Sequence, residues 1–275
     1  MAKFLTYSHD DTWIHRLCGA TKLIFFILWS VLGMITYDTR VLLAMLIISM
    51  IAFYMSKIKY KQVSMVFKVI CLFLIINILA IFIFSPYEGT KIYGTRHDLL
   101  HLFGKYTLTK EQIFYECNVA LKYFTVIPAA LLFIVTTNPS EFAASLNRLG
   151  VNYKIGYSIS LAFRYIPDIQ RDFNEIKQSQ EARGIDMSKD VSLPTRVKSM
   201  GAILFPLIFS SMERIDVISN AMELRGFGKS KKRTWYTARP FTRMDYMVII
   251  FTVVFSIISL VFTFYDGSRF YNPFM

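Results

Sequence analysis

Apolar residues are concentrated in long runs that are separated by short polar turns. A helix needs roughly 20 apolar residues to cross a bilayer. Five runs approach or reach that length, and the first two, of about 15 residues each, are short for a span. They cover residues 23–37, 41–55, 63–84, about 113–136 and about 246–264. The pattern predicts an all-α membrane protein with about five transmembrane helices, the first two joined as a hairpin through Asp38-Thr39-Arg40.

Residues 138–243 follow a different pattern, in which apolar positions recur at three- and four-residue steps among charged ones. One series runs over 159–176 and the other over 208–222. This spacing predicts two long amphipathic helices. The chain then divides into residues 1–137, with four spans, the charged region 138–243, and residues 244–275, with the last span and a tail.

Both amphipathic helices are predicted to end in the same way, at Ala182-Arg183-Gly184 and at Leu224-Arg225-Gly226. Glycine supplies the left-handed residue that stops a helix, and an arginine in the last turn complements the helix dipole. One such ending is ordinary helix termination. Two of them, on two similar helices, favour a pair of docking tips. Pro167 and Pro206 each remove a backbone hydrogen bond and are predicted to kink these helices.

The composition agrees with a membrane protein, since 54% of the 275 residues are hydrophobic and only 18% are charged. The net charge of +12 comes mainly from lysines and arginines that flank the apolar runs. That distribution is typical of cytoplasmic retention and argues against a nucleic-acid partner. The basic loop Lys57, Lys59 and Lys61 is expected in the cytoplasm. Five spans then place the N-terminus inside and the C-terminus outside a multi-pass protein of the cell membrane.

The sequence offers little for catalysis. Cys18, Cys71 and Cys117 are isolated, so neither a disulfide framework nor a metal or redox motif is indicated. Gly228-Lys229-Ser230 resembles the end of a phosphate-binding loop, but the first glycine of that motif would fall on Glu223, and a helix precedes it where a strand is needed. No catalytic residue and no cofactor are expected in this chain.

One alternative concerns His97 and His101, which are four residues apart with Asp98 beside the first. On a helical turn both imidazoles could reach one metal ion, and a membrane-embedded metalloenzyme would follow. Solvated histidines in a loop between spans three and four explain the same residues. We expect no metal site.

Several short segments together resemble the T component of energy-coupling factor transporters. They are Thr136-Thr137-Asn138-Pro139, Leu146-Asn147-Arg148-Leu149-Gly150-Val151, Phe163-Arg164-Tyr165-Ile166-Pro167 and the two arginine tips. Near the N-terminus, His15-Arg16-Leu17 and Thr21-Lys22-Leu23 resemble the family pattern, with Cys18-Gly19 where Asp-Pro is usual.

The resemblance implies a non-catalytic membrane scaffold of an ABC-type importer for vitamins or metal ions, and we expect vitamin uptake. The tips at Arg183 and Arg225 would dock into two cytosolic ATP-binding subunits, which hydrolyse the ATP. Apolar surfaces of the same helices would hold a separate substrate-binding membrane subunit. The second tip departs from the family pattern, with Leu224 in place of alanine. The closest alternative is a T component dedicated to cobalt or nickel uptake.

Overall fold

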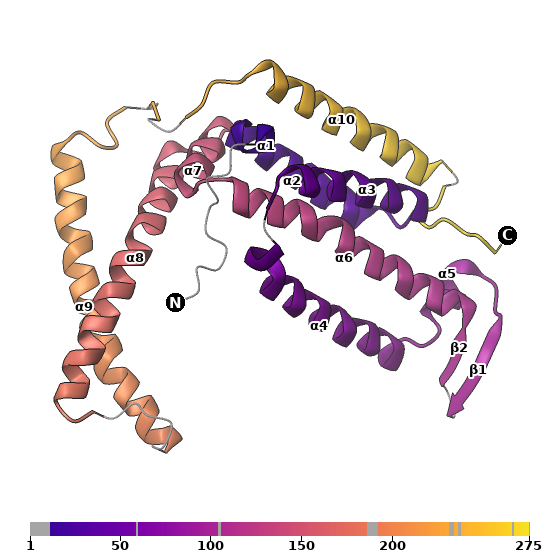
Figure 1. The fold of residues 1–275 in the computed structure, drawn as a ribbon, viewed down its shortest axis with the longest axis horizontal. Helices are drawn as coiled ribbons and strands as arrows, with labels where there is room; N and C mark the ends of the chain where they lie inside the picture. Colours follow the sequence, from indigo (N-terminus) through magenta and orange to yellow (C-terminus); the bar gives the residue numbers. More distant parts are fainter. Residues whose placement is uncertain are drawn as a thin grey trace. The chain divides into compact units, whose positions relative to one another are not determined.

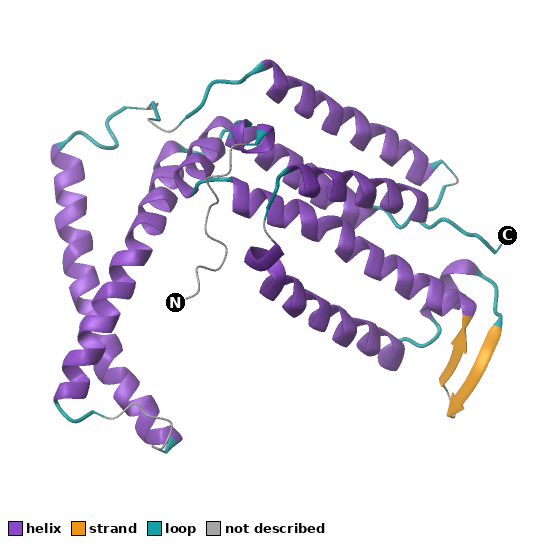
Figure 2. Cartoon of the chain, in the orientation of Figure 1, coloured by secondary structure: helices purple, strands orange, loops and turns teal. Residues whose placement is uncertain are grey.

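The computed structural model describes residues 12–58, 60–103, 106–185, 192–230, 234–235, 238–265 and 267–274. Helices dominate these residues, and the strands form one short hairpin (Figure 2). The helices are α1 Trp13–Arg16, α2 Gly19–Ile35, α3 Thr39–Met55, α4 Tyr60–Phe84, α5 Glu88–Tyr93, α6 Lys110–Thr136, α7 Pro139–Arg148, α8 Tyr153–Ala182, α9 Leu193–Leu224 and α10 Arg243–Phe264. The strands are β1 Asp98–Phe103 and β2 Tyr106–Thr109.

The chain forms two compact units, which we describe separately. The first comprises Met1–Phe142 and Arg239–Met275 and holds the apolar helices. The second comprises Ala143–Ala238 and holds α8 and α9. Figure 1 shows the elements of each unit along the chain.

The first unit contains the helices predicted to cross the membrane. Among the described residues, Val63–Phe84 of α4, α6 and α10 are long and apolar enough to do so. Helices α2 and α3 are apolar but have only 17 residues each. At 1.5 Å per residue each covers about 25 Å of a hydrocarbon core that is about 30 Å thick. The all-α fold agrees with the prediction. Of the five predicted spans, three have the length of a crossing among the described residues, and α2 and α3 are shorter apolar helices.

Helix α6 lies at the centre of this unit and packs against α2, α3 and α4. Trp29 and Met45 are fully buried where α2 and α3 meet α6, together with Ala129. Gly33 lets α2 approach α6 closely, because a Cβ there would lie 3.0 Å from Cγ2 of Val126. Small residues commonly allow this kind of packing between membrane helices.

Two carboxylates from distant parts of the chain accept hydrogen bonds at the start of helix α2. Asp245, at the start of α10, accepts hydrogen bonds from the backbone N–H of Cys18 and from Oγ1 of Thr21, both at 2.8 Å. Glu141, at the start of α7, accepts one from the N–H of Gly19 at 2.8 Å. The first N–H groups of a helix have no partner within the helix, so these bonds satisfy them. The Cys18-Gly19 segment of the N-terminal motif is therefore a structural junction.

The connection between α4 and α6 is more ordered than the sequence indicated. The predicted loop contains α5 and the antiparallel β1–β2 hairpin, in which Asp98 pairs with Thr109 and His101 with Thr107. Gly89 of α5 lies against the Glu111 backbone of α6 with no space for a side chain. The sequence pattern did not indicate this hairpin, because strand pairing depends on contacts between residues that hydrophobic periodicity does not show.

Candidate docking site on the two long helices

Helices α8 and α9 pack against each other in the second unit (Figure 1). Between them lies a groove of about 630 Å³ whose walls include Leu161, Ile166, Ile215 and Met222. An ion pair also joins the helices, because Nη2 of Arg214 donates to Oδ2 of Asp172 at 2.7 Å. Apolar packing and this ion pair together hold the two helices against each other.

The first arginine tip has well-defined local geometry. Helix α8 ends at Ala182, Arg183 is the C-cap residue, and Gly184 takes the left-handed conformation with φ of 88°. The N–H of Gly184 donates to the Glu181 carbonyl at 3.0 Å, and the N–H of Ile185 donates to the Gln180 carbonyl at 3.1 Å. This pair of bonds is the Schellman motif.

The second tip repeats this geometry residue by residue. Arg225 is the C-cap of α9 and Gly226 has φ of 73°. The N–H of Gly226 donates to the Glu223 carbonyl at 2.8 Å, and that of Phe227 donates to the Met222 carbonyl at 2.9 Å. The same two bonds close both helices, so both arginines occupy equivalent positions at helix ends.

The arginine side chains of both tips are exposed. Arg183 and Arg225 are exposed, as is Ala182, and Leu224 is 90% exposed. Within the described ranges, neither arginine makes an ion pair with a carboxylate of its own chain. Pro167 and Pro206 lie inside α8 and α9, and both helices continue past them.

The tip at Arg225 is held against the start of α8. Phe227 packs its ring on Tyr157 at a centroid distance of 4.9 Å and on Tyr153 at 5.7 Å. Further along, Nε1 of Trp235 donates to Oδ1 of Asn147 at 3.1 Å. Helix α8 thus carries one tip at its C-terminus and supports the other at its N-terminus. Sequence reasoning missed this link, because no local pattern pairs Phe227 with residues some 70 positions earlier.

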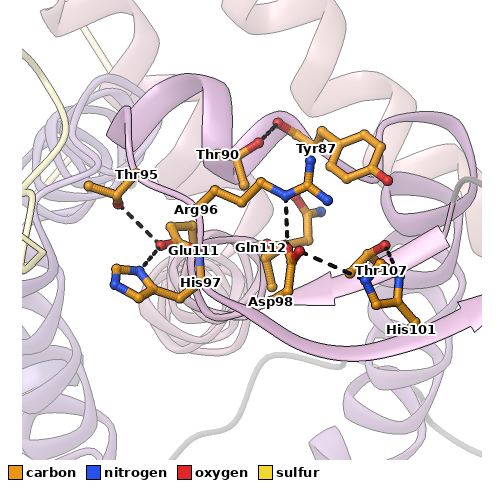
Figure 3. Close-up of polar contacts among 11 residues, drawn as sticks. Tyr87, Thr90, Thr95, Arg96, His97, Asp98, His101, Thr107, Glu111 and Gln112 are labelled. Atoms are coloured by element: carbon orange, nitrogen blue, oxygen red, sulfur yellow. Dashed lines mark hydrogen bonds and ion pairs between the residues drawn. The ribbon is translucent and has the colours of Figure 1, made fainter.

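The two histidines of the possible metal site do not share a helical turn (Figure 3). His97 precedes β1 and its Nδ1 lies 2.6 Å from Oε1 of the buried Glu111, whereas His101 lies within β1 and its Nδ1 is 3.0 Å from Oγ1 of Thr107. Arg96 donates to Asp98 at 2.8 Å, and this hydrogen bond lowers the pKa of Asp98. The helical reading of His97 and His101 is wrong. Over the described part of the chain, no three candidate ligands gather as a metal site would need.

These features define an integral membrane protein that combines apolar helices with a separate unit of two long helices ending in matched arginine tips. The family model described as cobalt transport protein, CbiQ, matches residues 10–236. The chain therefore belongs to this family, which includes the transmembrane components of energy-coupling factor transporters.

Curated relatives agree with that assignment. The chain is 24% identical over 255 residues to the energy-coupling factor transporter transmembrane protein EcfT of Exiguobacterium sibiricum, covering 90% of this chain and 93% of the relative. It is 25% identical over 258 residues to the protein of the same name from Streptococcus thermophilus, covering 89% and 92%. The relative from Ruminiclostridium cellulolyticum is 30% identical over 173 residues, 60% of this chain and 64% of its own length.

Proposed function

We propose that the chain is the scaffold and energy-coupling subunit of an importer, and that two cytosolic ATP-binding subunits dock on its arginine tips. Residues 138–243 form the coupling region, with contacts at Ala182, Arg183 and Gly184 on one tip and at Leu224, Arg225 and Gly226 on the other. The supporting observation is that α8 and α9 end in the same Schellman motif, each with an exposed arginine at the C-cap.

The chemistry of arginine suits this role. Its guanidinium stays charged and can bind a carboxylate of a partner through two parallel hydrogen bonds. A helix transmits the movement of its end along its length. Because α8 and α9 are joined by packing and by the Asp172–Arg214 pair, approach of the two ATP-binding subunits would change the angle between the helices. ATP hydrolysis takes place in the partners, and this chain is not an enzyme.

The apolar surface of α9 supports a membrane partner. Large apolar side chains along this helix are more than half exposed: Val197, Phe205, Ile208, Phe209, Met212, Ile215 and Val217. Exposed apolar patches of this kind mark contact sites for proteins or lipid. We assign this surface to a substrate-binding membrane subunit that receives the motion of the helices.

Vitamins are the proposed substrates, as the resemblance to energy-coupling factor transporters implies, and the relatives that align with most of the chain carry the name of that transporter class. A component dedicated to cobalt or nickel is the second candidate, since the family model is described as a cobalt transport protein. Purification of the tagged chain from its own membranes separates the two. We expect two ATP-binding proteins and a small membrane protein to co-purify, and the bound substrate of that small protein to be a vitamin. Recovery of the chain with no ATP-binding protein would contradict the proposed function.

The orientation of the chain is also a proposal. Five apolar helices and the lysines after α3 favour an N-terminus in the cytoplasm and a C-terminus outside. A reporter that is active only in the cytoplasm should be silent when fused after Met275 and active when inserted between α8 and α9. Activity at Met275 would show that the number of crossings is even.

A further inference from the structure

The first unit contains an apolar groove that the proposed function does not use. It has a volume of about 530 Å³ and lies between α2, α4 and α6. Its walls include Gly33, Val66, Ile70 and Ala130, and the few polar side chains include Lys122 and Tyr37. The groove therefore has a long apolar part and a cationic group.

Two cations lie near the ring of Tyr37, which lines the groove: Lys122, also a lining residue, and Arg269, from the segment that follows α10. Nζ of Lys122 lies 3.2 Å from the ring centroid of Tyr37, and Cζ of Arg269 lies 5.4 Å from the same centroid. Arg269 is held there by the backbone, because the N–H of Tyr37 donates to its carbonyl at 3.0 Å. Cation–π attraction stabilises each cation on the ring, but the two positive charges repel each other.

No carboxylate of the described residues balances the charge of this pair. Throughout the described ranges, neither Lys122 nor Arg269 has a carboxylate within ion-pair distance. One N–H of the Lys122 ammonium donates to the Met34 carbonyl at 2.9 Å and the ammonium also contacts the Tyr37 ring, so at least one of its three donors is left for another partner. A lysine in a membrane helix is costly, and one that faces a second cation without a carboxylate fits an external anion.

We propose that this groove binds one anionic phospholipid, with its phosphate at Lys122 and Arg269 and an acyl chain along α6 between Val126 and Ile134. The combination of apolar walls and a cation favours a lipid over a protein helix, because a phospholipid carries an acyl chain and a phosphate in one molecule. A single acyl chain is thin enough to follow the groove. Dissolved phosphate would bind the cations and leave the apolar walls unoccupied.

Native mass spectrometry of the detergent-purified chain tests the proposal, with phosphatidylglycerol and phosphatidylcholine of identical acyl chains as probes. We expect one phosphatidylglycerol to bind with clear preference. A basic side chain near a membrane surface contributes about 1 kcal/mol to binding of an acidic lipid, or about fivefold in affinity. The double variant Lys122→Gln, Arg269→Gln should therefore weaken phosphatidylglycerol binding by roughly 25-fold and remove the preference.

Matched variants distinguish lipid binding in this groove from nonspecific attraction of anionic lipid to a basic protein. Lys68→Gln with Arg243→Gln removes two exposed cations from α4 and α10 and should leave binding unchanged. Ala130→Phe keeps both cations and fills the groove, so it should lose the lipid even if the double variant does not fold. Equal binding of both lipids, unchanged binding in Ala130→Phe, or full displacement of phosphatidylglycerol by inorganic phosphate would overturn the proposal. So would absence of this lipid from the complex with partner subunits, which would mean that a protein covers the groove.

Discussion

The double variant Arg183→Glu, Arg225→Glu is expected to abolish uptake in reconstituted vesicles, while the chain inserts into the membrane at normal abundance. Each arginine is exposed and lies beyond the last helical residue, so neither side chain supports a core. In the complex, charge reversal would place two carboxylates together. Truncating one partner of a desolvated ion pair costs about 2–5 kcal/mol, and repulsion adds to that loss.

Matched cations on the same helices provide the control. Arg171 of α8 and Lys198 of α9 are exposed, and neither lies at the C-terminal end of its helix. Arg171→Glu with Lys198→Glu makes the same change in net charge and should retain most of the uptake. If both double variants lose uptake equally, the effect belongs to the overall charge of the unit and the tips have no special role.

The second large effect is expected at Asp245, and it concerns stability. This carboxylate is fully buried and accepts bonds from Cys18, Thr21 and Thr242. Asp245→Ala would leave several buried donors without a partner at the joint between α2 and α10. Each unsatisfied donor costs about 1–3 kcal/mol, so we expect a loss of at least about 3 kcal/mol and a clearly lower unfolding temperature in detergent.

Two further variants make this prediction specific. Asp245→Asn keeps one acceptor oxygen and should fall between wild type and Asp245→Ala. Asp168→Ala removes a partly exposed carboxylate whose described ion pair is with Arg171, on the next turn of the same helix, and should unfold at the wild-type temperature. An Asp245→Ala protein as stable as Asp168→Ala would show that the buried carboxylate does not hold the joint.

The sequence predicted those parts of the fold that depend on local signals. Apolar runs indicate membrane helices directly, and an arginine followed by glycine indicates a helix end, so the geometry at Gly184 and Gly226 matches the expectation. The roles of the tips in docking stay a prediction. The junction at Asp245 also had a local signal, since Thr242 and Asp245 form a capping box at the spacing that defines it.

Features that depend on distant contacts were not predictable in this way. His97 and His101 have a spacing that suits one face of a helix, yet Asp98–Phe103 pairs with Tyr106–Thr109 as two antiparallel strands, and the two rings have different partners. The packing of Phe227 on Tyr153 and Tyr157 brings the end of α9 to the start of α8. No local sequence pattern indicates this contact, because the residues are far apart in the chain. In both cases the deciding contacts come from residues that single-sequence periodicity does not connect.

The central claim is that the two helix ends are where the ATP-binding subunits attach, and the stoichiometry of the purified complex tests it most directly. Native mass spectrometry should find two ATP-binding subunits on the wild-type chain and on the Arg171→Glu, Lys198→Glu control. The Arg183→Glu, Arg225→Glu chain should carry none, while its membrane partner remains bound. A tip variant that still carries both ATP-binding subunits would show that the two arginines only terminate their helices.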